Sequence, residues 1–271
     1  MGLLSLIPLE GGGAEAELHG WPPGVDSFKA KPMWPGVLPD WFTNHILQAI
    51  IAAILIIAFW VWVTRNQKIV PGKKQAVGEM IYDLVRNSIA RDIIGHDYHK
   101  YVPYLLAVFS FILVNNLFGE VFIFMFPTFS KIGFVYALAL CSWLLYNLAG
   151  IKKHGFVGYL KLSTLPAGVP WPLWFLIIPL EFLSNIIVRP LTLALRLFAN
   201  LFAGHLVVLV FVVGGTILLG SAEVFYKVAG GSAILFSFAI FALELLVSAI
   251  QAYIFTVLTA QYVSSAIAQE H

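Results

Sequence analysis

Charged residues are scarce in this sequence. Only 11% of its 271 residues are Asp, Glu, Lys or Arg, whereas 60% are hydrophobic, and the mean hydropathy is +0.87. A soluble domain cannot bury so much apolar surface, so the composition predicts a protein integral to a membrane. The net charge is only +2 and basic residues form no run, which argues against a nucleic-acid partner.

Cysteine is nearly absent as well. The single residue, Cys141, excludes an intrachain disulfide and a cysteine-rich metal site. The short apolar run at the N-terminus has no basic segment before it, so we do not expect a cleaved signal peptide. No GxxxxGKS, GxxxxGKT, HExxH or GxSxG motif occurs, and no internal repeat is visible. We therefore expect no bound nucleotide, cofactor or metal and no catalytic residue.

What the sequence has instead is a series of long apolar stretches. They predict an all-α integral membrane fold, in which an exposed arm over 1–41 precedes a single membrane domain over 42–271. The segment 73–94 has apolar residues at helical spacing and is predicted to be an amphipathic helix on the membrane surface. The five predicted crossings are 42–64, 102–126, 133–151, 172–222 and 232–266, with the polar segment 152–171 as a loop.

The last two crossings are longer than a bilayer requires. At 1.5 Å per residue, the stretch 232–266 would reach ~52 Å, against a hydrocarbon core of ~30 Å. We expect these two helices to form a long antiparallel hairpin that either tilts by roughly 50° or more, if the helices are straight, or extends well beyond the hydrocarbon core.

Basic residues are distributed unevenly between the connecting segments. The segments 65–100 and 152–161 carry seven and three Lys or Arg, whereas the arm carries two and the turns at 127–132 and 220–231 carry one each. Because cytoplasmic loops are the more basic ones, we expect the N-terminus outside and the C-terminus inside.

One arginine interrupts the apolar stretch "LTLALRLFANLFAGH", residues 191–205. Arg196 has no acidic residue three or four positions away. A charge at bilayer depth costs about 2.5–3.5 kcal/mol, and a guanidinium does not lose its proton in a protein. On a helical wheel it lies beside a stripe of small residues, Thr192, Ala199 and Ala203, along which another helix could approach closely. We therefore predict its counter-ion on another polypeptide.

Polar residues occur on both sides of this arginine. Glu244, Ser248 and Gln251 share one face of the final helix. If the long helices pair with Arg196 level with Gln251, His205 and Glu244 meet about two turns away, toward the outer face. The outer set is predicted to contain Asn115, Asn116, Glu120, His205 and Glu244, and the inner set Glu181 and Thr192.

Each of these residues also has a plainer interpretation. His205 could be a structural hydrogen-bonding residue, and Asn200 could join two helices. Glu120 and Glu181 lie near span ends and could reach the interface. Arg196 is the residue for which the plain interpretation is weakest, and it would act as an electrostatic barrier that prevents direct proton leakage between the two sets.

Three segments resemble subunit a of the bacterial F-type ATP synthase. "PLTLALRLFANLFAGHLVV" (190–208) is similar to that family's arginine helix, and "ALELLVSAIQAYIFTVLTAQYV" (242–263) is similar to its final helix. "NNLFG" (115–119) is a further element, and the resemblance covers roughly residues 40–268.

The resemblance implies a non-catalytic stator beside a ring of c subunits, in the bacterial plasma membrane, with ATP made on other subunits. It implies two offset half-channels, and partners that include the b-subunit peripheral stalk and membrane lipid. One proton crossing 100 mV releases about 2.3 kcal/mol, which would drive ring rotation. A Na⁺-coupled version of the subunit, a membrane-embedded enzyme and a stand-alone secondary transporter are the alternatives.

The resemblance also implies residue roles. Arg196 matches the family's essential arginine, which faces the ring carboxylates, and Asn200 and Gln251 match polar positions around it. His205 and Glu244 match a pair that elsewhere occurs with acid and histidine exchanged. Glu181 matches the acid of the inner path.

Overall fold

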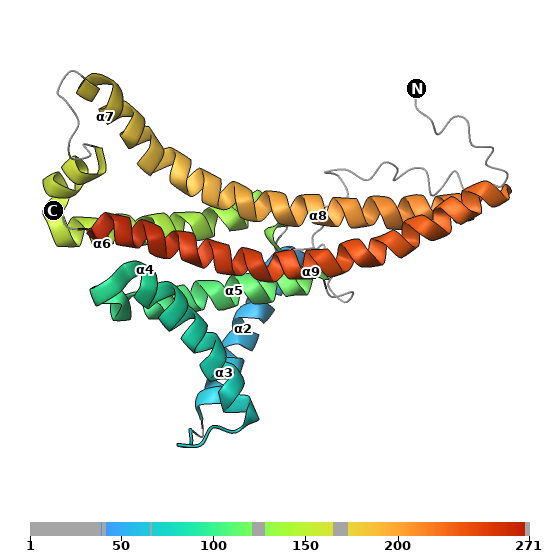
Figure 1. Cartoon of the computed structure of the whole chain (residues 1–271), viewed down its shortest axis with the longest axis horizontal. Helices are drawn as coiled ribbons and strands as arrows, with labels where there is room; N and C mark the ends of the chain where they lie inside the picture. Colours follow the sequence, from blue (N-terminus) through green and yellow to red (C-terminus); the bar gives the residue numbers. More distant parts are fainter. Residues whose placement is uncertain (1–38, 40–41, 66, 121–127, 165–172, 269–271) are drawn as a thin grey trace.

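The fold is built from helices. The structure is a computed structural model, and it describes residue 39 and residues 42–65, 67–120, 128–164 and 173–268. Every regular element in this part of the chain is a helix (Figure 1). The apolar helices long enough to cross a membrane are α2 (Asn44–Thr64), α5 (Val102–Glu120), α6 (Ile132–Thr164), the run Trp174–Leu219 and α9 (Val224–Ile267). The predicted all-α membrane fold with five crossings is confirmed, while nearly all of the arm and residues 121–126 of the second crossing lie outside the described residues.

The predicted hairpin is present. α8 (Arg189–Leu219) and α9 lie side by side and run in opposite directions (Figure 1). Their backbones approach closely at Gly230, where an added Cβ would lie 2.7 Å from the Gly215 carbonyl oxygen and 2.8 Å from the Leu219 nitrogen. Glycine is required there because any side chain would push the two helices apart.

The start of α9 was predicted wrongly. The segment 224–231 is helical rather than part of a turn, so α9 begins eight residues before the predicted position 232 and has 44 residues. The close contact at Gly230 explains the difference, because this glycine serves helix packing and does not end the helix. At 1.5 Å per residue α9 is ~66 Å long, which requires a steeper tilt or a longer extension beyond the bilayer than we predicted.

The arginine-bearing stretch is one helical run with a local change of winding. α7 (Trp174–Leu183) continues through a π-helical turn, η7 (Ser184–Val188), into α8. Pro190, in the first turn of α8, lacks a backbone donor, and the wider π turn directly precedes it. In Figure 1 α7 bends away from α9, so the paired part of the hairpin is α8 with α9.

The polar segment after residue 151 is not a loop. α6 continues to Thr164, with a break at Gly155, whose φ is 73° and ψ 166°. This backbone conformation suits glycine and lets the second part of the helix fold back. The Tyr159 hydroxyl donates to Asn147 Oδ1 at 3.0 Å, across the break. The predicted loop is therefore wrong for 152–164, and residues 165–171 lie outside the described residues.

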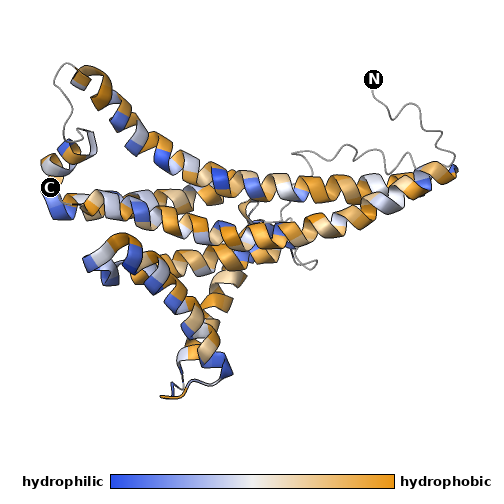
Figure 2. Cartoon of the chain, viewed as in Figure 1, coloured by the Kyte–Doolittle hydropathy of each residue, from blue (hydrophilic) through white to orange (hydrophobic). Residues whose placement is uncertain are grey.

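The predicted surface helix has the expected bounds. It consists of α3 (Lys73–Asp83), the π-helical η3 (Leu84–Arg91) and α4 (Asp92–Ile94), followed by the 3₁₀ turn η4 (Gly95–Lys100). Val85 and Ile89 are buried in the central core, whereas Met80 is exposed. The core itself lies between α5, α6, α8 and α9, where Leu105, Leu197 and others pack. Figure 2 shows hydrophilic residues gathered at the foot of the α2–α3 pair and at the end where α9 finishes.

Candidate functional site

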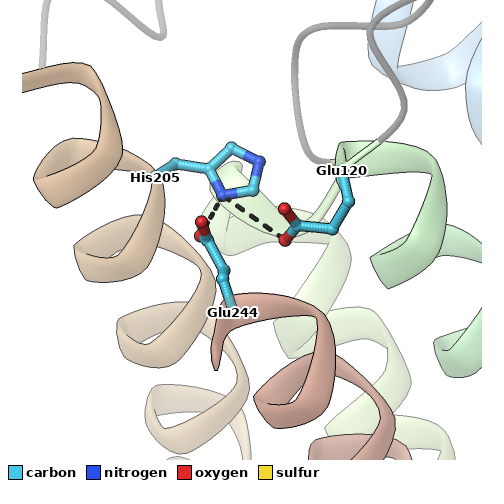
Figure 3. Close-up of side chains that lie close together, drawn as sticks. All are labelled: Glu120, His205 and Glu244. Carbon is cyan, nitrogen blue, oxygen red and sulfur yellow. Dashed lines mark hydrogen bonds and ion pairs between the residues drawn. The ribbon is translucent and has the colours of Figure 1, made fainter. Parts of the chain in front are cut away.

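Three helices bring two carboxyl groups and an imidazole together. Glu120 ends α5, His205 lies in α8 and Glu244 lies in α9 (Figure 3). His205 Nδ1 is hydrogen-bonded to Glu244 Oε1 and lies 3.9 Å from Glu120 Oε1. Only 7% of Glu120 and 5% of Glu244 is exposed. The predicted contact between His205 and Glu244 is therefore present, and Glu120 joins it.

The geometry of the imidazole constrains its protons. His205 Nε2 lies 3.1 Å from the Gly119 carbonyl oxygen, which can only accept, so Nε2 carries a hydrogen and donates it. The contact between Nδ1 and Glu244 Oε1 then needs a further proton, because two lone pairs would repel each other. That proton is held either as an imidazolium facing a carboxylate or as a neutral imidazole facing a carboxyl group. The pair is a unit that holds one transferable proton.

Neighbouring side chains support the acidic groups. Ser248 Oγ donates to Glu120 Oε1 at 3.3 Å, and Asn116 Nδ2 donates to the Ser248 carbonyl oxygen at 3.0 Å. Both residues are buried. Asn115, which was predicted in the same set, instead donates to the Phe111 carbonyl oxygen of its own helix at 2.8 Å.

The register of the hairpin differs from the predicted one. Asn200 Nδ2 donates to Gln251 Oε1 at 2.8 Å, so Asn200 rather than Arg196 is level with Gln251. Arg196 is one helical turn away, which is ~6 Å along α8. The close packing further along the hairpin sets this register: a Cβ added at Gly204 would lie 2.9 Å from Glu244 Cδ.

Arg196 lies on a face of α8 that no described part of the chain covers. Its side chain is exposed and makes no hydrogen bond or ion pair with any residue in the described ranges. Thr192, Ala199 and Ala203, which form the small-residue stripe, are exposed beside it. Thr192 Oγ1 donates to the Val188 carbonyl oxygen at 2.8 Å, within the same helix. Arg196 and the small-residue stripe therefore lie together on one exposed surface of α8.

Comparison with known proteins decides the family. The profile described as ATP synthase A chain matches residues 46–264. The chain belongs to this family. A protein named ATP synthase subunit a from Nocardioides sp. is 53% identical over 229 residues, which cover 84% of this chain and 83% of the relative. Proteins of the same name from Pseudarthrobacter chlorophenolicus and Rhodococcus erythropolis are 40% and 34% identical, and they cover 91% and 95% of this chain and 92% and 94% of their own length.

This member of the ATP synthase A chain family also has a pocket at the start of the arginine helix. The pocket has a volume of about 110 Å³, and its polar lining residues are Tyr159, Ser163, Glu181, Asn185, Arg189 and Ser265. Arg196 lies seven residues beyond Arg189 and nine before His205, so it stands ~10.5 Å from one and ~13.5 Å from the other along the helix axis. Glu181 and the His205 cluster therefore lie on opposite sides of the arginine.

Some of the predicted site residues lie together in the structure and others do not. Glu120, His205 and Glu244 lie together, and Asn116 contacts the backbone of Ser248, which bonds Glu120, whereas Asn115 does not join them. Thr192 does not line the pocket with Glu181 but lies on the exposed stripe. The conducting roles of all these residues stay predictions.

Sequence reasoning missed three contributors to the site. The Gly119 carbonyl binds the imidazole, the absence of a side chain at Gly204 makes room for Glu244, and Asn185 lines the inner pocket. A helical glycine directly before His205 was a usable signal of close approach, because glycine is otherwise unfavourable inside a helix.

Proposed function

We propose that the chain is the proton-conducting stator subunit of the membrane sector of a bacterial F-type ATP synthase. In this proposal two offset half-channels carry protons to and from the carboxylates of a c-subunit ring, and the b-subunit stalk holds the stator. The observation that carries the proposal is the contact between His205 and Glu244, which can share a transferable proton and lies among helices long and apolar enough to cross a membrane. The relatives named ATP synthase subunit a agree with it.

The outer half-channel would run through the cluster of Glu120, His205 and Glu244. A proton held between the imidazole and Glu244 can be passed on, and Glu120, 3.9 Å from the imidazole, offers a second acceptor. The inner half-channel would run from the pocket at Glu181. Water must reach both, because an isolated carboxylate in dry hydrocarbon stays protonated and cannot relay.

Arg196 would keep the two half-channels separate. A ring helix could lie along the exposed small-residue stripe and bring its carboxylate to the guanidinium. At ~4 Å and an effective dielectric constant of about 20, this attraction is ~4 kcal/mol, so the carboxylate is stable without its proton beside Arg196. Away from the stator it faces lipid, where a charge costs about 2.5–3.5 kcal/mol, so it must take up a proton before it leaves.

The tilt of the hairpin fits the same arrangement. Of the segments predicted to be inside, 65–100 runs from the foot of the α2–α3 pair to α4, and 152–161 lies in the second part of α6, near the end of α9 (Figure 1). A membrane plane that keeps both of these regions on one side crosses α8 and α9 obliquely. This supports an outer N-terminus, a cytoplasmic C-terminus and a steeply tilted hairpin.

The donor groups favour protons over Na⁺, the alternative coupling ion. Hard cations such as Na⁺ are held by oxygen ligands, whereas the central group of the cluster is an imidazole. Synthesis of ATP would take place on other subunits.

The test of the proposal is substitution of the arginine. Arg196→Ala is expected to abolish proton-driven ATP synthesis in membrane vesicles while the complex still assembles, because the barrier charge is lost. Arg65→Ala, which removes an exposed arginine just after α2, is the control and should behave as the unmodified complex. Near-normal synthesis by the assembled Arg196→Ala complex would refute the proposal.

A further inference from the structure

The cluster of Glu120, His205 and Glu244 also has the composition of a metal site. We propose that it binds a divalent transition-metal cation of the Zn²⁺ type and that the bound metal blocks the outer half-channel. The binding site is inferred from geometry alone, whereas the block rests on the proposed function.

The spacing of the donor atoms suits such a cation. The three candidate ligand atoms, one from each residue, all lie within 4.8 Å of one another, and His205 Nδ1 is 3.9 Å from Glu120 Oε1. Zinc bonds to nitrogen and oxygen are about 2.0–2.2 Å, so tetrahedral ligands lie ~3.3–3.6 Å apart. The two carboxylates would have to rotate to reach this spacing, and a water molecule would supply the fourth ligand.

A second group of contacts already orients the ligands. Ligating histidines almost always donate their other ring N–H to a carbonyl or carboxylate, and His205 Nε2 donates to the Gly119 carbonyl oxygen at 3.1 Å. This leaves Nδ1 to face the two acids. Ser248 Oγ donates to Glu120 Oε1, which orients the second ligand, and Ser248 is 2% exposed.

The types of ligand atom in the cluster favour a particular class of metal. One imidazole and two carboxylates suit zinc and neighbouring transition metals, whereas Ca²⁺ takes six to eight oxygen ligands and Mg²⁺ keeps several waters. Two carboxylates also neutralise the two charges of the cation, so the occupied site carries no net charge into the membrane interior.

Metal binding and proton relay exclude each other at this site. Nδ1 can bind a metal only through its lone pair, so the proton shared with Glu244 must leave when the metal enters. While the metal is bound, neither Nδ1 nor the Glu244 carboxylate can pass a proton on. The site would therefore act as a metal-dependent stop on the outer half-channel.

The binding test uses the purified complete complex and zinc chloride. X-ray absorption at the zinc edge should show one bound Zn²⁺ per chain with one imidazole nitrogen and carboxylate oxygens at about 2.0–2.2 Å. His205→Asn and Glu120→Gln should lose this zinc, and Ser248→Ala should weaken its binding about 10–100-fold. Glu181→Gln, which removes a carboxylate outside the site, is the matched control and should bind normally. Zinc bound equally by all four variants, or without an imidazole ligand, overturns the site.

The functional test measures passive proton flow in vesicles of known orientation. Zn²⁺ on the outer side should stop the flow, while Mg²⁺ at the same concentration should not. Unchanged flow with the site occupied overturns the block. The two proposals fail separately, since full synthesis by Arg196→Ala would refute the stator role and leave the zinc spectrum in place, whereas absence of zinc would leave the arginine result in place.

Discussion

Gly204 gives the sharpest structural prediction for the proton pair. A Cβ at this position would lie 2.9 Å from Glu244 Cδ, closer than side chains tolerate, and Glu244 is buried. Gly204→Ala is therefore expected to move the carboxyl end of this flexible side chain away from His205. Loss of a hydrogen bond to a charged group costs about 1.5–3 kcal/mol, so proton flow should fall roughly 10–150-fold.

The assay is passive proton flow through the membrane sector in vesicles. Gly231→Ala is the matched control, because Gly231 also lies in a long hairpin helix and an added Cβ there has nothing within 4 Å. Both substitutions gain the same helix propensity, about 1 kcal/mol relative to glycine, so only the contact with Glu244 differs. Equal flow in the two variants would refute the placement of Glu244 against α8.

Three further predictions concern the arginine, the pair and the fold. Arg196→Lys should also lose most proton-driven synthesis in vesicles, because a lysine can lose its proton and lacks the planar fork; synthesis close to normal would contradict this. Removing His205 and Glu244 together should slow proton flow little more than removing either, so additive losses in a double-mutant cycle would argue against a shared proton. Gly155→Ala should lower the stability of the α6 region by roughly 1–2 kcal/mol, seen as a lower unfolding temperature, because φ is positive there, whereas Gly158→Ala should not.

The membrane fold was predictable because long apolar runs have few alternatives. Five helices long enough to cross a membrane, the bounds of the helix over 73–94 and the hairpin follow from hydropathy and helical spacing. The mistakes occurred at glycines. Gly155 breaks α6 without ending it, and Gly230 lies inside α9 because two backbones touch there. In the sequence both glycines look like loop residues. Only the packing shows that each lies within a helical segment.

The contact between His205 and Glu244 could be predicted from the sequence, but the register between the two helices could not. One helical face holds Glu244 and Gln251, so their alignment with α8 could be guessed only to about one turn. The observed register depends on the fit of Glu244 against Gly204 and of Gly230 against Gly215, which are properties of two helices together. The Gly119 carbonyl lay beyond prediction for the same reason, since a backbone oxygen has no signature in the sequence.

The central claim is that Arg196 separates a half-channel open to the outside from one open to the inside. In a Cys141→Ser background, His205→Cys and Glu181→Cys complexes can each be exposed to a small aqueous thiol reagent from one side of the membrane. We expect His205→Cys to react only from outside and Glu181→Cys only from inside, because their polar surroundings lie on opposite sides of the arginine. Labelling of both positions from the same side would contradict the two half-channels and with them the proposed mechanism.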